Sequence, residues 1–148
     1  MKENFDCTQF ITYDAEENIN DVIDSFVSIG FTVIPFDKIR NVKKEYFKEY
    51  FRSNVYELKW DEFLGYFDEW QEDGETPKPI IDFANVLKSV IKCSKVSNLR
   101  VILTNFAEEG LSTNEVIKVK DKKIMEGLYL MSSKNFEVWT DNLVLEIE

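Results

Sequence analysis

Seven carboxylates lie within the segment WDEFLGYFDEWQEDGE, residues 60–75, which contains no lysine or arginine. Carboxylates at this density could pair with cationic side chains of a partner, bind a hard metal ion, or serve as an acid and base pair. The segment also contains two tryptophans, two phenylalanines and a tyrosine, so part of it has to be buried. The residues that we expect to form a binding surface are Asp61, Glu62, Tyr66, Asp68, Glu69, Glu72, Asp73 and Glu75.

A helix over this segment would separate its residues into two faces. At about 100° per residue, the apolar residues share an arc of about 120°, and most of the acids fill about 140° on the opposite side. The apolar arc contains Trp60, Phe63, Leu64, Phe67 and Trp70. We therefore expect a helix that begins near Asp61, with both tryptophans in the core and Tyr66 at the boundary between the faces.

The carboxylate face opposes the helix less than burial of the apolar face favours it. Like charges three or four residues apart, such as Glu69 with Asp73, destabilise a helix by roughly 0.2–0.5 kcal/mol per pair. Each fully buried large apolar side chain contributes roughly 1.5–3 kcal/mol, so packing can sustain the helix without a partner. Two interpretations of the face remain open, neutralisation by the basic face of a helix predicted over residues 37–52 or by a basic partner. The basic residues of that helix are Lys44, Lys48 and Arg52.

The residue types on which most catalytic and metal sites depend are missing. The chain has no histidine, the commonest general base and metal ligand. Its five glycines are too scattered to form a phosphate-binding loop or a dinucleotide fingerprint. A calcium loop counted from Glu69 fails because Ile80 stands at the twelfth position, where a bidentate glutamate is needed. We interpret the adjacent acids Glu108 and Glu109 as solvated surface, and we expect no catalytic residue, metal site or cofactor.

The formal net charge of −10 restricts the classes of partner. Affinity for nucleic acid depends on Lys and Arg that neutralise phosphates, and an anionic membrane surface repels an acidic protein. We therefore expect neither nucleic acid nor membrane as a direct partner. Negative charge favours fast encounter with basic proteins instead.

Length and composition predict one domain over residues 1–148. The first residues lack the apolar run of a signal peptide, and no stretch approaches the roughly eighteen apolar residues of a membrane span, so we expect a cytoplasmic protein. Cys7 and Cys93 are far apart and have no CxxC context, which predicts free thiols in a reducing compartment.

The apolar pattern predicts strands and helices over the first two thirds of the chain. Alternation indicates a strand at 5–13, and spacings of three and four indicate a helix from about Ile19 that ends at Gly30. The further expected elements are a strand at 31–35, the helix over 37–52, an extended link or strand at 55–58, a helix opened by Pro79, a strand at 99–106, and either a strand or a helix at 115–120.

Three short apolar runs close the chain, at 128–132, 136–140 and 143–148. The turn-forming residues between them predict an antiparallel β-meander. In the last run alternation places Leu143, Leu145 and Ile147 inward, and the strand offers an edge that could pair with a partner. We therefore expect an α+β fold, with an N-terminal strand and helices packed on an antiparallel sheet that ends in this meander.

A small acidic α+β chain with no catalytic set and a concentrated carboxylate face resembles the bacterial toxin immunity proteins, including those of contact-dependent growth inhibition systems. The resemblance is one of overall character, without a shared motif. It implies a non-catalytic inhibitor that binds a cognate toxin domain, often a nuclease with a basic groove. A rival acidic surface consists of Asp14, Glu16, Glu17, Asp21 and Asp24.

Two other classes of function fit the same residues. An acidic surface would also serve a phage-type DNA mimic that inhibits a host enzyme. Carboxylates and tyrosine in a pocket would serve a small enzyme or a ligand-binding domain, which the missing histidine and glycine motifs disfavour.

Overall fold

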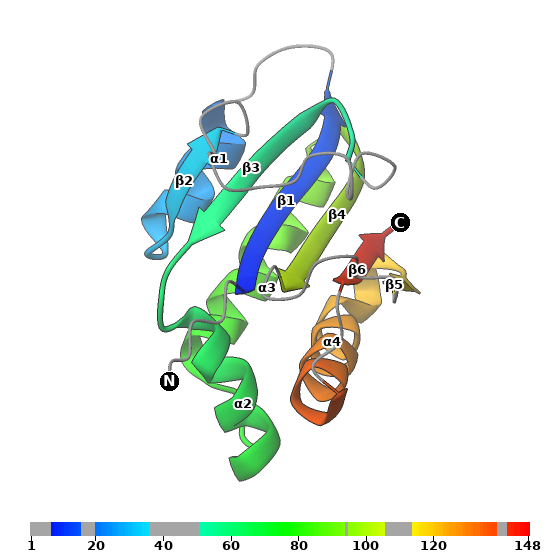
Figure 1. The fold of residues 1–148 in the computed structure, drawn as a ribbon. Helices are drawn as coiled ribbons and strands as arrows, with labels where there is room; N and C mark the ends of the chain where they lie inside the picture. The colour runs from blue at the N-terminus through cyan, green and yellow to red at the C-terminus, as the bar shows by residue number, and fades with distance from the viewer. Residues whose placement is uncertain (1–6, 16–19, 36–50, 94, 106–113, 139–141) are drawn as a thin grey trace.

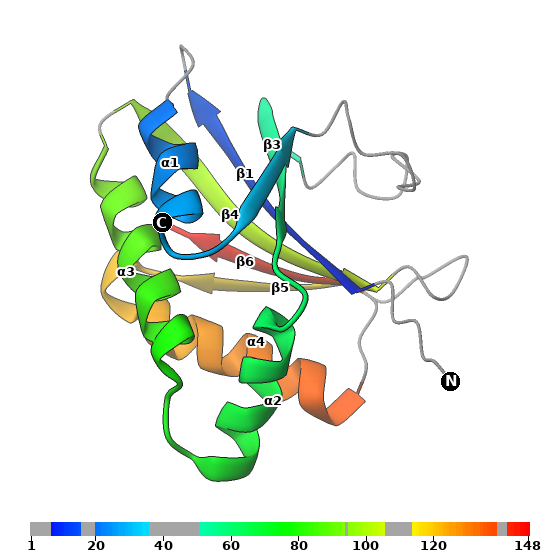
Figure 2. The same cartoon turned by 90° about the vertical axis from the view of Figure 1, so that its left-hand side faces the viewer.

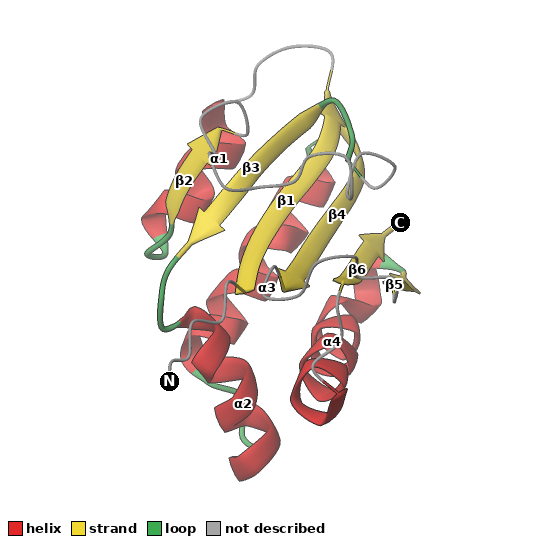
Figure 3. Ribbon diagram, viewed as in Figure 1, coloured by secondary structure: helices red, strands yellow, loops and turns green. Residues whose placement is uncertain are grey.

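Six strands of the described residues form one sheet in the computed structural model, and helices pack on it (Figures 1 and 3). The structure describes residues 7–15, 20–35, 51–93, 95–105, 114–138 and 142–148. Along the chain the elements are β1 (Cys7–Ala15), α1 (Asn20–Ser28), β2 (Thr32–Pro35), β3 (Asn54–Lys59), α2 (Phe63–Asp73), α3 (Lys78–Lys92), β4 (Val96–Asn105), β5 (Asn114–Val119), η3 (Asp121–Lys123), α4 (Ile124–Val138) and β6 (Asn142–Ile147).

The sheet has the strand order β2-β3-β1-β4-β6-β5. β1 runs antiparallel to both β3 and β4, β6 runs antiparallel to β4, and β5 and β6 are parallel. Figure 2 shows the described helices on one side of the sheet, with α1 and α3 along it and α2 and α4 towards one end. The α+β fold expected from the sequence, with its N-terminal strand, is confirmed.

The core on the helix side is centred on aromatic rings. Gly30 has a φ of 124°, and the Phe31 N–H then donates to the Phe26 carbonyl at 3.2 Å, which ends α1 and turns Phe31 inward. The Phe31 ring lies 4.7 Å from that of Phe63 and 5.6 Å from that of Phe83, measured between centroids. Residues from α1, α2 and α3 therefore meet at one side chain.

Strand alternation divides the sheet between two apolar clusters. On β1, Ile11 belongs to the main core under the helices, and Phe10 belongs to a second cluster on the other face. Cross-strand pairing places Phe10 opposite Ile102, and Ile102 opposite Val144. All three are fully buried, and Phe51 and Val55 pack against them. The face without described helices is thus apolar at its centre.

The predicted C-terminal meander is wrong for its first two strands. Residues 128–132, and 136–138 of the next run, belong to α4. Ile124, Leu128 and Met131 are all fully buried, whereas Leu130 is 46% exposed. A strand would have placed Leu128 and Leu130 on one face, so the helical spacing of four and three decides the structure. The parallel pairing of β5 with β6 also requires a crossover, which α4 supplies.

The last strand is not an edge, contrary to expectation. β6 lies between β4 and β5, and among the described strands β2 and β5 are at the edges of the sheet. Leu143, Leu145 and Ile147 face inward as predicted, but Val144 is also fully buried because it joins the second cluster. Edge-to-edge pairing with a partner through β6 is therefore excluded.

Most of the other expected elements are found. Residues 55–58 lie in β3, residues 115–119 form a strand rather than a helix, and α3 begins one residue before Pro79.

Cys93 is a free thiol. The predicted helix over 37–52 lies outside the described residues except for its last two, which have no regular secondary structure, and Glu108 and Glu109 also lie outside. Within the described segments, no helix is both long and apolar enough to cross a membrane.

The two glycines of α2 and α4 give opposite predictions for the same substitution. A Cβ at Gly127 would stand 2.7 Å from Cδ1 of the buried Leu145 and 3.1 Å from Val119, whereas a Cβ at Gly65 would meet nothing within 4 Å. We expect Gly127→Ala to lower the free energy of unfolding by about 1–3 kcal/mol and Gly65→Ala to raise it by up to about 1 kcal/mol. Urea unfolding measures both, and a Gly127→Ala variant as stable as the parent would contradict the close packing of α4 on the sheet.

Candidate functional site

The acidic segment forms helix α2 and its flanking turns. Phe63 begins the helix, where its N–H donates to the Trp60 carbonyl at 2.9 Å, and Gly74 ends it with a φ of 79° and a hydrogen bond to the Trp70 carbonyl. The predicted start near Asp61 is two residues early. Asp61 lies in a turn because the chain still has to bring Trp60 against the ring of Phe31, 5.4 Å away.

The apolar face of α2 points into the core, as predicted. Phe63, Phe67 and Trp70 are at most 4% exposed, and Leu64 and Trp60 are half-buried. The ring of Phe63 contacts that of Phe83 in α3, and Trp70 contacts Tyr129 in α4 edge-on at 4.9 Å. These contacts fix the rotation of α2, and they orient the opposite face towards solvent.

A buried polar contact also fixes α2 against α4. The Ser132 hydroxyl donates to the Phe67 carbonyl at 2.9 Å, and the Gln71 amide donates to the same hydroxyl at 3.1 Å. Ser132 is fully buried. The hydroxyl is satisfied both as a hydrogen-bond donor and as an acceptor, and a buried hydroxyl has few alternative partners. This contact therefore favours a single packing arrangement of α2 against α4. Local sequence does not indicate this contact, because the apolar run at 128–132 predicts a strand that ends at Ser132.

The predicted carboxylate face is largely exposed. Asp68 is half-buried and Tyr66 is likewise half-buried against Trp60 and Phe63. The exposed acids of the segment are Asp61, Glu62, Glu69, Glu72, Asp73 and Glu75. Tyr66 is therefore part of the edge of the core, and the exposed side chains of α2 are all carboxylates.

No ion pair between described residues involves an acid of 61–75. The pairs are Lys78–Asp82, Arg100–Glu146, Lys118–Glu146, Lys120–Glu148, Lys123–Glu126 and Lys134–Glu115. Of the basic residues that might have neutralised the face, Lys44 and Lys48 lie outside the described part of the chain. Arg52 is described, and its backbone N–H donates to Thr12 on the face of the sheet opposite α2. Arg52 therefore does not neutralise α2.

Asp68 shows the electrostatic cost of this arrangement. Partial burial, and then the negative charge of Glu72 one turn away, raise the pKa of Asp68 above its ordinary value. A cation held against this carboxylate would lower the pKa instead. The direction of the shift therefore agrees with a face that carries uncompensated negative charge.

An exposed aromatic side chain that the sequence reading missed lies beside α2. Tyr129 of α4 is 43% exposed while one edge contacts Trp70, and its neighbour Leu130 is exposed as well. Tyrosine is enriched in protein interfaces because it combines apolar area with a polar tip. The apolar run at 128–132 predicts a strand, so the position of Tyr129 on a helix beside α2 could not be inferred from the sequence.

The rival acidic cluster is not one surface in the described residues. Asp14 lies in β1, where the Ser53 N–H and then the Asn98 amide bind its carboxylate and lower its pKa. Asp21 and Asp24 are exposed on α1, and residues 16–19, with Glu16 and Glu17, lie outside the described segments. The Asp14 carboxylate is thus occupied by hydrogen bonds within the fold, and only Asp21 and Asp24 are exposed acids among the described residues of this cluster.

The described residues also contain no group of three or more acids and cysteines placed to hold a metal ion. Comparison of the chain with protein-family models, with curated proteins and with solved structures finds no match. The interpretation of the α2 face therefore depends on its own geometry and charge.

Replacing Asp68 tests whether its charge is compensated. Because the folded state raises its pKa, the wild-type protein loses stability as the pH rises from the ordinary value of 3.8 through the raised value. We expect Asp68→Asn to be more stable than the wild type at pH 7, and we expect this difference to shrink below pH 4, as measured by denaturant unfolding at both pH values.

The matched control is Glu69→Gln, which removes one charge from the exposed part of the same face. Its effect should be smaller and less dependent on burial. A loss of stability in Asp68→Asn at pH 7 would mean that a cation of the chain already binds Asp68.

Proposed function

We propose that the chain is a non-catalytic inhibitor that acts in the cytoplasm and binds a basic protein domain through the carboxylate face of α2. One observation carries the proposal: six exposed acids lie together on and around one helix, and none forms an ion pair within the described residues. The apolar side of α2 is already used in the core, so the outer face is not needed for folding.

A nuclease toxin is the partner that this surface would fit best. The Lys and Arg side chains in a nuclease groove hold phosphates, and carboxylates on a rigid helix could pair with the same cations. Complementary charge would also speed the encounter of the two proteins. This function is the one implied by the resemblance to toxin immunity proteins, and it requires no catalytic residue.

The contact surface would combine charge with an aromatic anchor. Tyr129 is exposed and contacts Trp70 at the junction of α2 and α4. Interfaces concentrate binding energy in a few aromatic and charged residues near their centre. We therefore include Tyr129 in the proposed surface and leave out Tyr66, whose ring is packed against Trp60.

Charge reversal on α2 tests the surface. Changing Glu69 and Glu72 together to Lys removes two negative charges and adds two positive ones, which moves the formal net charge from −10 to −6. We expect affinity for a basic partner to fall at least about 10-fold, because close interfacial charge pairs are worth about 1.5 kcal/mol or more. The melting temperature should not fall, since each new Lys lies four residues from Asp68 or Asp73.

The matched control is the double change Asp21→Lys and Asp24→Lys on α1, which alters net charge equally on the rival surface. The partner to use is the C-terminal domain encoded by the neighbouring open reading frame, tested by co-purification and by rescue of growth on co-expression. If both double variants lose capture of the partner equally, the loss comes from the change in net charge and does not locate the interface on α2. If the wild-type chain neither co-purifies with this domain nor rescues growth, the proposal of an immunity function is contradicted. Capture of a host DNA-binding enzyme instead would identify the chain as a DNA mimic.

A further inference from the structure

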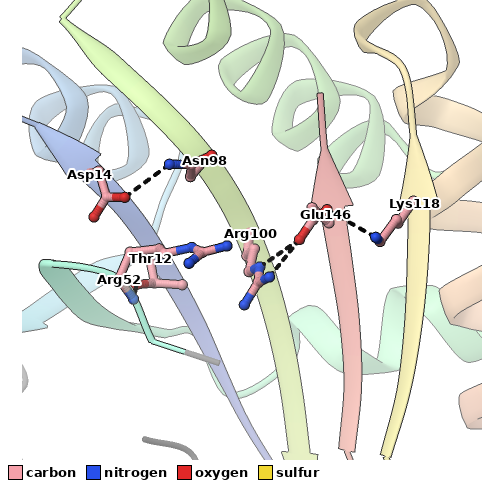
Figure 4. A network of polar contacts seen from close by, with 7 residues as sticks. All are labelled: Thr12, Asp14, Arg52, Asn98, Arg100, Lys118 and Glu146. Atoms are coloured by element: carbon pink, nitrogen blue, oxygen red, sulfur yellow. Dashed lines mark hydrogen bonds and ion pairs between the residues drawn. The ribbon is translucent and has the colours of Figure 1, made fainter. Parts of the chain in front are cut away.

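A polar network crosses the face of the sheet that has no described helix (Figure 4). The strand register aligns Thr12 with Arg100, Arg100 with Glu146, and Glu146 with Lys118. These side chains share one face because directly paired residues in a sheet point the same way. The row lies on the side of the sheet opposite α2, so it is separate from the carboxylate face.

Arg52 is held at one end of this row. Its backbone N–H donates to the Thr12 hydroxyl at 2.7 Å, and that hydroxyl donates to the Asn54 carbonyl at 2.8 Å. Figure 4 shows the Arg52 side chain reaching over β1 towards Arg100. Two guanidinium groups of like charge are therefore directed to the same part of the sheet.

The charge of Arg52 acts on Asp14 and helps to lower the pKa of that carboxyl, but one nitrogen of the Arg52 guanidinium has no hydrogen-bond acceptor among the described residues. This nitrogen is Nε, which is fully buried. A charged donor removed from water without a partner costs more free energy than a neutral one, and buried charges in proteins are normally paired. Such a group calls for an acceptor.

Two carboxylates of the network, Glu146 and Asp14, are already hydrogen-bonded to other residues. Glu146 accepts the Nε of Arg100 at 2.9 Å and its Nη2 at 2.6 Å, and its second oxygen lies 3.8 Å from Nζ of Lys118. Asp14 accepts the Ser53 N–H and the Asn98 amide. Glu57 lies on the same face, where burial raises its pKa and the charge of Lys59 opposes this shift only in part.

The network consequently carries an excess of positive charge. Arg52, Arg100 and Lys118 contribute three positive charges, and Asp14 and Glu146 contribute two negative ones, so the group is positive by one in a chain whose net charge is −10. A guanidinium presents planar N–H donors that match the oxygens of a phosphate or a carboxylate.

We propose that Arg52, beside Arg100, forms a binding site for a small oxyanion, a phosphate or carboxylate group, on the face of the sheet that has no described helix. Arg52 supplies the hydrogen-bond donors. Arg100, which Glu146 already holds in place, supplies adjacent positive charge. The anion would complete the hydrogen bonding of the buried Nε and remove the repulsion between the two guanidinium groups.

The Nε–H resonance of Arg52 in a ¹⁵N-labelled sample reports on this site directly. We expect inorganic phosphate, acetate or both to shift it saturably, and we expect chloride at the same ionic strength not to do so. The same anion should raise the melting temperature of the wild-type protein. Phosphate alone would indicate a phosphorylated ligand, and acetate alone a carboxylate ligand.

In Arg52→Gln, the anion concentration needed for the same rise in melting temperature should be at least about 10-fold higher, because a charged hydrogen-bonded pair is removed. Lys88→Gln, which removes the same charge from the exposed side of α3, should leave that effect unchanged. An Nε–H shift that follows chloride equally, or an anion effect that survives in Arg52→Gln, would overturn the proposal.

Discussion

Burial of one aromatic stripe controls the organisation of this protein. Phe63 and Phe67 of α2 pack into the core formed by Phe31 and Phe83, and the Ser132 hydroxyl holds the backbone of the same helix. Each buried ring favours folding by roughly 1.5–3 kcal/mol, whereas each like-charge pair on the other face opposes it by roughly 0.2–0.5 kcal/mol. Packing therefore fixes the rotation of the helix, and the crowded carboxylates are directed outward as a consequence.

The sheet separates two regions of opposite electrostatic character. On the helix side, α2 exposes carboxylates that no cation of the described residues neutralises. On the other side, Arg52 and Arg100 lie together, and Asp14 and Glu146 are hydrogen-bonded to other groups. Because a sheet's two faces alternate along every strand, one chain can carry both regions without their charges cancelling. An acidic protein can in this way present a local anion site.

Sequence periodicity predicted the strands and helices whose apolar spacing was unambiguous, including β1, α1 and the core face of α2. It failed at 128–138, where a short apolar run fits both periods, and the burial of Leu128 with Met131 rather than with Leu130 decides for the helix. Long-range contacts, such as Ser132 with Phe67, leave no local signature. The acids of α2 were predictable by position. Tyr129 and the Arg52 network were not, because they depend on which segments the fold brings together.

The pKa of the Asp68 carboxyl, followed by its ¹³C resonance across a pH titration, tests the central claim that the α2 face is uncompensated. If the face is uncompensated, we expect a pKa above the ordinary value of 3.8 in the free protein, because burial and Glu72 both disfavour the charged form. We also expect a fall in that pKa when a basic partner domain binds. A pKa below the ordinary value in the free protein would show instead that a cation of the same chain already neutralises the face.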